Sequence, residues 1–205
     1  MNTILEQFVP NFKLTNDLKY DIQKFFTIHN DKETLEHTLK VAAEARRVAQ
    51  LYNADPLKAE QVGLLHDISN VIPVKEMLHV AEVLSIEILP EERTYARIVH
   101  QKLSKAMAFE IFKIDDQEML SAIECHTTMK PHSSLLDKVL FISDKISWEL
   151  PGDHQYLKDI RTKVDEHKIA EGILIYLNNI WEQRDKLKLV HPWLIKAREE
   201  LLKQF

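Results

Sequence analysis

The chain has 205 residues, of which 45% are hydrophobic and 29% charged, and this length suffices for one buried core. Only 3 glycines and 7 prolines occur, which disfavours Gly-rich phosphate loops and turn-dense β architectures. The net charge of −5 and the lack of a Lys/Arg-rich block argue against an extended nucleic-acid interface. A small-molecule partner therefore fits this composition better than nucleic acid.

The N-terminal stretch MNTILEQFVPNFKL has neither a cationic leader nor a long apolar run, so we expect no signal peptide and no membrane span. The single cysteine, Cys125, cannot form an intrachain disulfide. Both observations make the cytoplasm the expected compartment.

Apolar residues recur at three- and four-residue spacing in nearly every segment, which predicts helices throughout. A helix capped by Asn30 or Asp31 is expected to end near Asn53, and the next one to begin at Pro56. These helices are the first elements of a chain that is expected to be all-α.

Further helices are expected to begin at Pro73 and at Pro90, the second running with one break to Phe112. Asp115 or Asp116 then caps a helix that ends near the histidine of AIECHT. Each of these helices carries an apolar face suited to one common core.

Ser133 or Ser134 is expected to cap the helix LLDKVLFISDKISW. Two or three helices follow a Pro151–Gly152 turn, and Pro192 starts the last of them. The chain is thus expected to hold about ten helices and no strand.

His66 and Asp67 stand side by side after the apolar Val62, Leu64 and Leu65. A carboxylate drawn toward a helical core loses hydration worth several kcal/mol unless a hydrogen bond, a counter-charge or a metal ion replaces the water. Some partner must therefore face this pair.

Four further polar residues interrupt apolar helical segments in the same way: His37, His100, His126 and Asp144. A lone histidine on an apolar helix face is more often a hydrogen-bonded core residue, and a lone aspartate is often a cap. Together with the adjacent pair, however, they offer six nitrogen and oxygen ligands without a thiolate. Such a set suits iron, manganese, zinc or magnesium-like ions, and an aspartate can bridge two of them.

The order of these residues resembles the HD-domain metal-dependent phosphohydrolases. The matching segments read LEHTLKVAAEA, ADPLKAEQVGLLHDIS, DDQEMLSAIECHTTMKP and LLDKVLFISDKI, and they cover about Thr34 to Arg161. More narrowly, the chain is similar to the YqeK-like family, small helical symmetrical diadenosine tetraphosphate hydrolases with a dinuclear iron site.

This resemblance implies one HD-type helical bundle over residues 1–205, with a metal-binding core at about 30–165 and C-terminal helices at 166–205 packing on it. It also implies a homodimer. One metal ion would be held by His37, His66, Asp67 and Asp144, and a second by His100 and His126 with Asp67 as the bridge.

The implied cofactors are two divalent or trivalent ions, iron first, with manganese, zinc or magnesium as alternatives. The implied reaction is in-line attack of a metal-bridging hydroxide on an inner phosphorus of the tetraphosphate, giving two ADP. Asp67 and His66 would be the catalytic pair through that hydroxide. A nucleotide substrate is thus the expected partner, without nucleic acid or membrane.

Three segments depart from the family pattern. Asn70 stands where relatives usually have lysine, lysines follow His100 in place of a proline and a small residue, and residues 144–149 also differ. Two alternatives therefore stay open: a nucleotidase or pyrophosphohydrolase for another phosphorylated metabolite, and a non-catalytic nucleotide-binding regulatory module. The cations considered for substrate contacts are Lys102, Lys105, Lys130, Lys145 and Arg161.

Overall fold

The computed structural model describes residues 2–10, 12–148 and 152–205. All regular structure in these ranges is helical, which confirms the predicted all-α class. The α-helices are α1 (Thr3–Glu6), α2 (Leu18–Ile28), α3 (Lys32–Leu51), α4 (Pro56–Leu65), α5 (Val74–Val83), α6 (Pro90–Thr94), α7 (His100–Glu110), α8 (Gln117–Cys125), α9 (Leu135–Ile146), α10 (Gln155–Asp165), α11 (Ile169–Glu182) and α12 (Pro192–Leu202). The 3₁₀ helices are η1 (Ile68–Val71), η2 (Ala96–Val99) and η3 (Arg184–Lys186).

The helix starts follow the capping residues expected from the sequence. Asp31, Asp55, Asp116 and Ser134 each accept a hydrogen bond from a backbone N–H of the first helical turn. These bonds satisfy donors that have no partner inside the helix. The Pro151–Gly152 turn falls partly outside the described residues, because Pro151 is not among them.

The break expected after Pro90 falls at Tyr95. Helix α6 ends at Thr94, the backbone of Tyr95 leaves the helical region at φ −143° and ψ 79°, and η2 leads directly into α7. As a result His100 is the first residue of α7 and not part of a continuous long helix.

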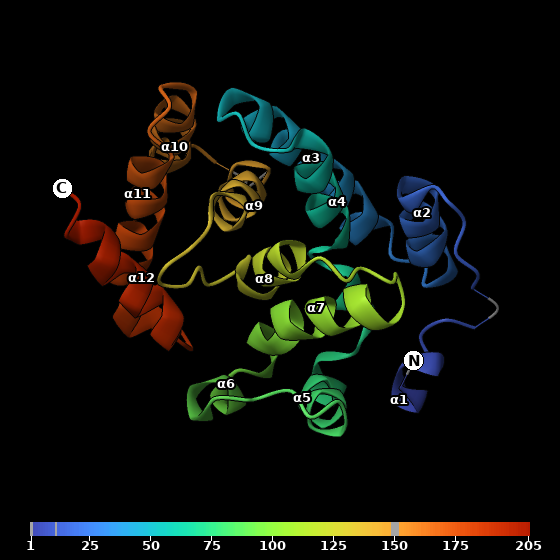
Figure 1. Ribbon diagram of the computed structural model, residues 1–205. Coiled ribbons are helices and arrows are strands. Elements are labelled where there is room, and N and C mark those ends of the chain that lie inside the picture. Colours follow the sequence, from blue (N-terminus) through green and yellow to red (C-terminus); the bar gives the residue numbers. More distant parts are fainter. Residues whose placement is uncertain (1, 11, 149–151) are drawn as a thin grey trace.

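The central layer is built by α3, α4, α8 and α9. Helix α3 packs on α4 and α9, while α8 packs on both α7 and α9. Figure 1 shows the C-terminal helices α10–α12 on one side of this layer and α1 and α2 on the opposite side. Every one of the predicted ligands lies on or next to the central helices and α7.

Helices α3 and α4 approach each other closely at Gly63. A Cβ atom built on Gly63 would lie 2.6 Å from the Cα of Ala42, a distance that no real Cβ contact tolerates. Glycine is therefore required here for the two backbones to meet. The same approach brings the rings of His37 and His66 to a centroid separation of 5.4 Å.

None of the helices in the described ranges combines the length and the apolar character needed to cross a bilayer.

Candidate metal centre

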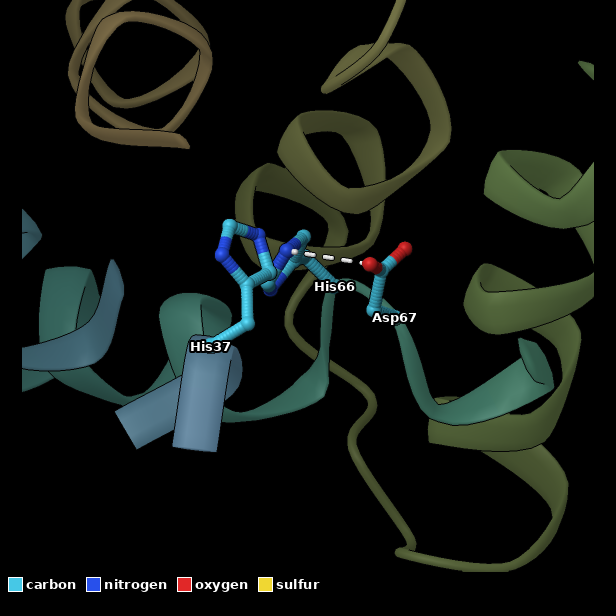
Figure 2. Close-up of side chains that lie close together, drawn as sticks. All are labelled: His37, His66 and Asp67. Carbon is cyan, nitrogen blue, oxygen red and sulfur yellow. Dashed lines mark ion pairs between the residues drawn. The ribbon is translucent and has the colours of Figure 1, made fainter. Parts of the chain in front are cut away.

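The structure brings together the six side chains that the sequence singled out, from five parts of the chain. Figure 2 shows His37, His66 and Asp67 turned toward one another. The positions are His37 within α3, His66 and Asp67 between α4 and η1, His100 at the start of α7, His126 directly after α8, and Asp144 within α9.

Asp67 lies at the middle of the cluster, with its two oxygens facing different histidines. Its Oδ2 is 3.6 Å from Nε2 of His66, the pair joined by the dashed line in Figure 2. Its Oδ1 is 3.3 Å from Nε2 of His100 and 3.4 Å from Nε2 of His126. One carboxylate is thus shared between two groups of imidazoles, which is the arrangement expected of a bridging ligand.

Asp144 adds a second carboxylate on the α3 side of the cluster. Its Oδ1 lies 3.0 Å from Nε2 of His37 and 3.8 Å from Nε2 of His66. Its Oδ2 accepts a 2.6 Å hydrogen bond from Nζ of the buried Lys145. One oxygen of Asp144 therefore faces the cluster while the other is held by the ammonium.

Three of the histidines are oriented by their own backbone. In each, Nδ1 lies within hydrogen-bond distance of the carbonyl three residues earlier, and because a carbonyl can only accept, Nδ1 must carry the proton. This leaves Nε2 as the free lone pair, directed at the cluster, as is usual for metal-binding histidines. The bonds run from His66 to Gly63 (2.7 Å), His100 to Arg97 (2.7 Å) and His126 to Ile123 (2.8 Å).

These residues fit a metal ion. Nε2 of His66 and Oδ1 of Asp67 are buried atoms without a hydrogen bond among the described residues. Such orphaned atoms cost stability unless something pairs with them. Three overlapping sets of ligand atoms lie within 4.8 Å of one another: His37, His66 and Asp67; His66, His126 and Asp144; and Asp67, His100 and His126.

The electrostatics keep the ligands in their binding forms. Burial alone would raise the pKa values of Asp67 and Asp144. The partners of each carboxyl together outweigh burial and hold both pKa values below their usual range: His66, His100 and His126 around Asp67, and Lys145 and the neighbouring histidines around Asp144. Burial lowers the pKa of His126 to about 4, against the raising effect of Asp67. Ionised carboxylates and a neutral imidazole are the species that bind metal.

An open cavity of about 590 Å³ gives access to the cluster. Five of the six side chains line it, whereas His66 is fully buried behind them. The cavity walls also carry three cations, Lys40, Arg97 and Lys145. The size and the positive groups suit a phosphorylated small molecule.

Two of the predicted substrate-binding cations lie at this cavity or beside it. Lys145 lines it, but its ammonium is held by Asp144 and by the carbonyl of His126 at 3.3 Å. Arg161 lines a second cavity of about 670 Å³, which shares the wall formed by Lys40, Ser147 and Trp148. The guanidinium of Arg161 donates to the carbonyl of Ile146.

The structure does not bring Lys102 and Lys130 to either cavity. Lys102 is buried and donates to Glu92 at 2.8 Å, while Lys105 pairs with Glu124 at 2.9 Å on the wall of another cavity. Lys130 donates to Ser121 and lies 3.3 Å from the buried Asp137. Acidic partners from other segments thus hold these lysines elsewhere.

Sequence reasoning missed Arg97, Lys40 and Thr127, which all line the cavity. Arg97 and Lys40 were detectable in principle, because residues three or four apart share a helix face. Arg97 precedes His100 by one turn, Lys40 follows His37 by three residues, and Thr127 adjoins His126. The Thr127 hydroxyl lies 3.1 Å from Nε2 of His100.

Comparison with known proteins places the chain in one family. The family model described as the HD domain matches residues 34–149, a span that contains all six residues. The chain therefore belongs to the HD-domain family.

The chain is also similar to individual known proteins. A Lactococcus lactis subsp. cremoris protein, described only as an uncharacterized protein in the pepC 5' region, is 38% identical over 85% of this chain and 87% of its own length. A Halalkalibacterium halodurans protein named symmetrical bis(5'-nucleosyl)-tetraphosphatase is 27% identical over 85% of this chain and 91% of its own length. A crystal structure of a predicted HD superfamily hydrolase from Clostridium acetobutylicum, described as involved in NAD metabolism, matches with a TM-score of 0.82 and 29% identity, covering 91% of this chain and 98% of that one.

Proposed function

We propose that the protein is a metal-dependent phosphohydrolase that cleaves diadenosine tetraphosphate symmetrically into two molecules of ADP. The observation that carries this proposal is the cluster around Asp67, with two carboxylates and four histidines at the base of an open cavity. The choice of substrate is supported by the relative named symmetrical bis(5'-nucleosyl)-tetraphosphatase.

The cluster would hold two metal ions, with iron as the first choice and manganese, zinc or magnesium as alternatives. Asp67 would be a ligand of both ions. His100 and His126 would bind one ion, and the other would be bound by His37, His66 and Asp144. Ions bound there would supply Lewis acidity toward the phosphoryl oxygens and toward an attacking water.

The chain's own residues prepare the site for this chemistry. Asp67 faces the imidazoles on both sides, and the backbone carbonyls hold the histidine Nε2 atoms toward the cluster. His66, fully buried, anchors the centre, while Lys145 keeps one oxygen of Asp144 occupied. Because these groups are fixed before substrate arrives, little reorganisation is needed for catalysis.

The test is chromatographic product analysis after incubating iron- or manganese-loaded protein with diadenosine tetraphosphate. Wild type is expected to give ADP as the sole product. An Asp67→Ala variant should keep its helical circular dichroism but lose both bound metal and activity, because the shared carboxylate is gone.

Each other outcome points to a different function. Unchanged metal content in Asp67→Ala would contradict the assignment of Asp67 as a ligand. Intact tetraphosphate in the presence of bound metal would reject this substrate. Turnover of another nucleotide from a panel would then favour a nucleotidase or pyrophosphohydrolase, and binding without turnover would favour a regulatory module.

The homodimer and the cytoplasmic location belong to the same proposal. Trp181 and Trp193 lie on α11 and α12, the helices that we assign to the dimer contact. Analytical ultracentrifugation of the purified chain tests this assignment, and a purely monomeric species at micromolar concentration would reject it.

A further inference from the structure

The cations of the cavity differ in what already binds them. The Lys145 ammonium is engaged by Asp144 and by the carbonyl of His126, and Lys40 also has an interaction partner. The Arg97 guanidinium has none: within the described part of the chain, this side chain forms no hydrogen bond and no ion pair. Arg97 is nevertheless half-buried in the cavity wall.

The backbone places this guanidinium beside the metal cluster. The carbonyl of Arg97 accepts the 2.7 Å hydrogen bond from Nδ1 of His100 and therefore helps to orient that ring. Residues one helical turn apart lie about 5–6 Å from each other at Cβ, within the reach of an arginine side chain. A phosphate group next to the cluster is thus within range of Arg97.

The distribution of charge around the cavity suits Arg97 to binding a phosphate. Each phosphate of a dinucleoside tetraphosphate carries a negative charge, so the phosphates outside the metal cluster need other cations. The α3 edge of the cavity carries the exposed Glu33 and Glu36, which disfavour phosphate there. A half-buried arginine without a partner is the group best suited to bind a phosphate through two parallel N–H···O bonds.

We propose that the Arg97 guanidinium binds a phosphate adjacent to the one that is attacked, and so positions the polyphosphate with an inner phosphorus at the metal cluster. This inference rests on the proposed phosphohydrolase function and adds the residue that sets the position of the substrate. It makes Arg97 a substrate-binding residue, and Lys102 and Lys130 structural ones.

The test compares Arg97→Gln and Arg97→Lys with Arg93→Gln, a matched control whose side chain pairs with Glu82 at 2.6 Å outside the cavity lining. Calorimetric titration of manganese-loaded proteins with ADP, inorganic phosphate and adenosine measures affinity directly. Metal content and circular dichroism show whether each variant is folded and loaded.

Arg97→Gln is expected to weaken ADP binding by about 10-fold or more, the loss typical of one hydrogen bond to a charged group. Arg97→Lys should recover part of this loss, because it keeps the charge but not the planar fork. Binding of adenosine, which has no phosphate, should stay unchanged, and Arg93→Gln should behave as wild type. With diadenosine tetraphosphate, Arg97→Gln should raise KM more than it lowers kcat and should add AMP and ATP to the products.

The outcomes separate this inference from the function on which it rests. ADP affinity within about twofold of wild type in Arg97→Gln, with wild type still producing ADP, would overturn the role of Arg97 alone. Wild type that makes no ADP, together with weakened ADP binding in Arg97→Gln, would overturn the substrate and leave the phosphate site standing. Wild type that binds neither ADP nor inorganic phosphate would overturn the inference outright.

Discussion

Asp144 and Lys145, which are adjacent in α9, form a buried ion pair beside the cluster. Asp144 offers one oxygen to His37 and the other to Lys145, whose side chain is only 1% exposed. Burial alone would lower the pKa of Lys145, but Asp144 raises it above its usual value, so the ammonium stays charged. Lys145 therefore acts as the counter-charge of Asp144 and is not free to bind a phosphate.

This ion pair predicts that replacing Lys145 destabilises the metal-free protein more than the metal-loaded protein. Lys145→Met should lower the free energy of unfolding of the metal-free protein by about 3–5 kcal/mol, because it leaves the Asp144 carboxylate buried without its partner. The loss should be smaller with manganese bound, since a cation beside Asp144 replaces the missing charge. Urea denaturation of both forms measures the difference.

Lys138, on the same helix, provides the control for this measurement. It is half-buried, and Lys138→Met should change stability by no more than about 0.5 kcal/mol in either form. Equal losses in metal-free and manganese-loaded Lys145→Met would show that the ammonium does not compensate Asp144.

Among the helices, the packing of α3 on α4 controls the spacing within the cluster. His37 lies on α3, and His66 follows the last residue of α4. The two helices meet where Gly63 faces Ala42, one turn before His66. The absence of a side chain at Gly63 therefore controls how near His37 comes to His66.

Gly63→Ala should consequently destabilise the protein by about 1–3 kcal/mol, the usual cost of overpacking. It should also weaken metal binding, because separating α3 from α4 moves His37 away from His66. Thermal unfolding and metal titration measure the two effects.

Gly172 in α11 is the matched control, since a Cβ there would meet its nearest neighbour, the carbonyl oxygen of Ile160, at 3.5 Å, an ordinary contact. Gly172→Ala should stabilise the protein by about 0.5–1 kcal/mol, because alanine favours a helix. Equal changes in stability for Gly63→Ala and Gly172→Ala would contradict the conclusion that the helices approach unusually closely at Gly63.

Across the molecule, a buried network joins segments that are far apart in sequence. Glu92 of α6 accepts hydrogen bonds from Lys102 of α7 at 2.8 Å and from His191, which caps α12, at 3.0 Å. Nδ1 of His191 accepts from the backbone N–H of Trp193, so its Nε2 is the donor to Glu92. We propose on this basis that residues 1–205 fold as one domain, with the C-terminal helices bound to the core.

The network also predicts a pH dependence of stability. Burial would raise the pKa of Glu92, but the bonds from His191 and Lys102 lower it below its ordinary value of 4.5. A carboxylate with a lowered pKa stabilises the fold fully above its ordinary value, and this contribution is lost as pH falls through the folded-state pKa. Glu92→Gln should therefore cost about 3–5 kcal/mol at pH 7 and less in acid.

Metal-free protein is the form to measure, because the proposed metal ligands then titrate equally in wild type and Glu92→Gln. In a Trp148→Phe background, the fluorescence of Trp181 and Trp193 reports on α11 and α12, while circular dichroism reports on all helices. If the chain is one domain, Glu92→Gln shifts both transitions equally. A shift in the fluorescence transition without a shift in the circular dichroism transition would contradict the proposal that the chain is one domain.

The helical class, most helix starts and the set of candidate ligands follow from the amino-acid sequence alone. These features depend on short-range patterns: apolar spacing, capping side chains such as Asp31, Asp55 and Ser134, and polar residues such as Asp67 that interrupt apolar runs. Each pattern lies within a few consecutive residues, so it can be recognised without knowing which distant segments pack against it.

Which cations face the cavity depends instead on how the helices pack. Lys102 and Arg97 lie five residues apart, yet Lys102 is held by Glu92 while Arg97 lines the cavity. The close approach at Gly63 likewise depends on Ala42 of another helix. The physical reason is the same in both cases: partners from distant segments fix a side chain's direction, and no local pattern records which partner it meets.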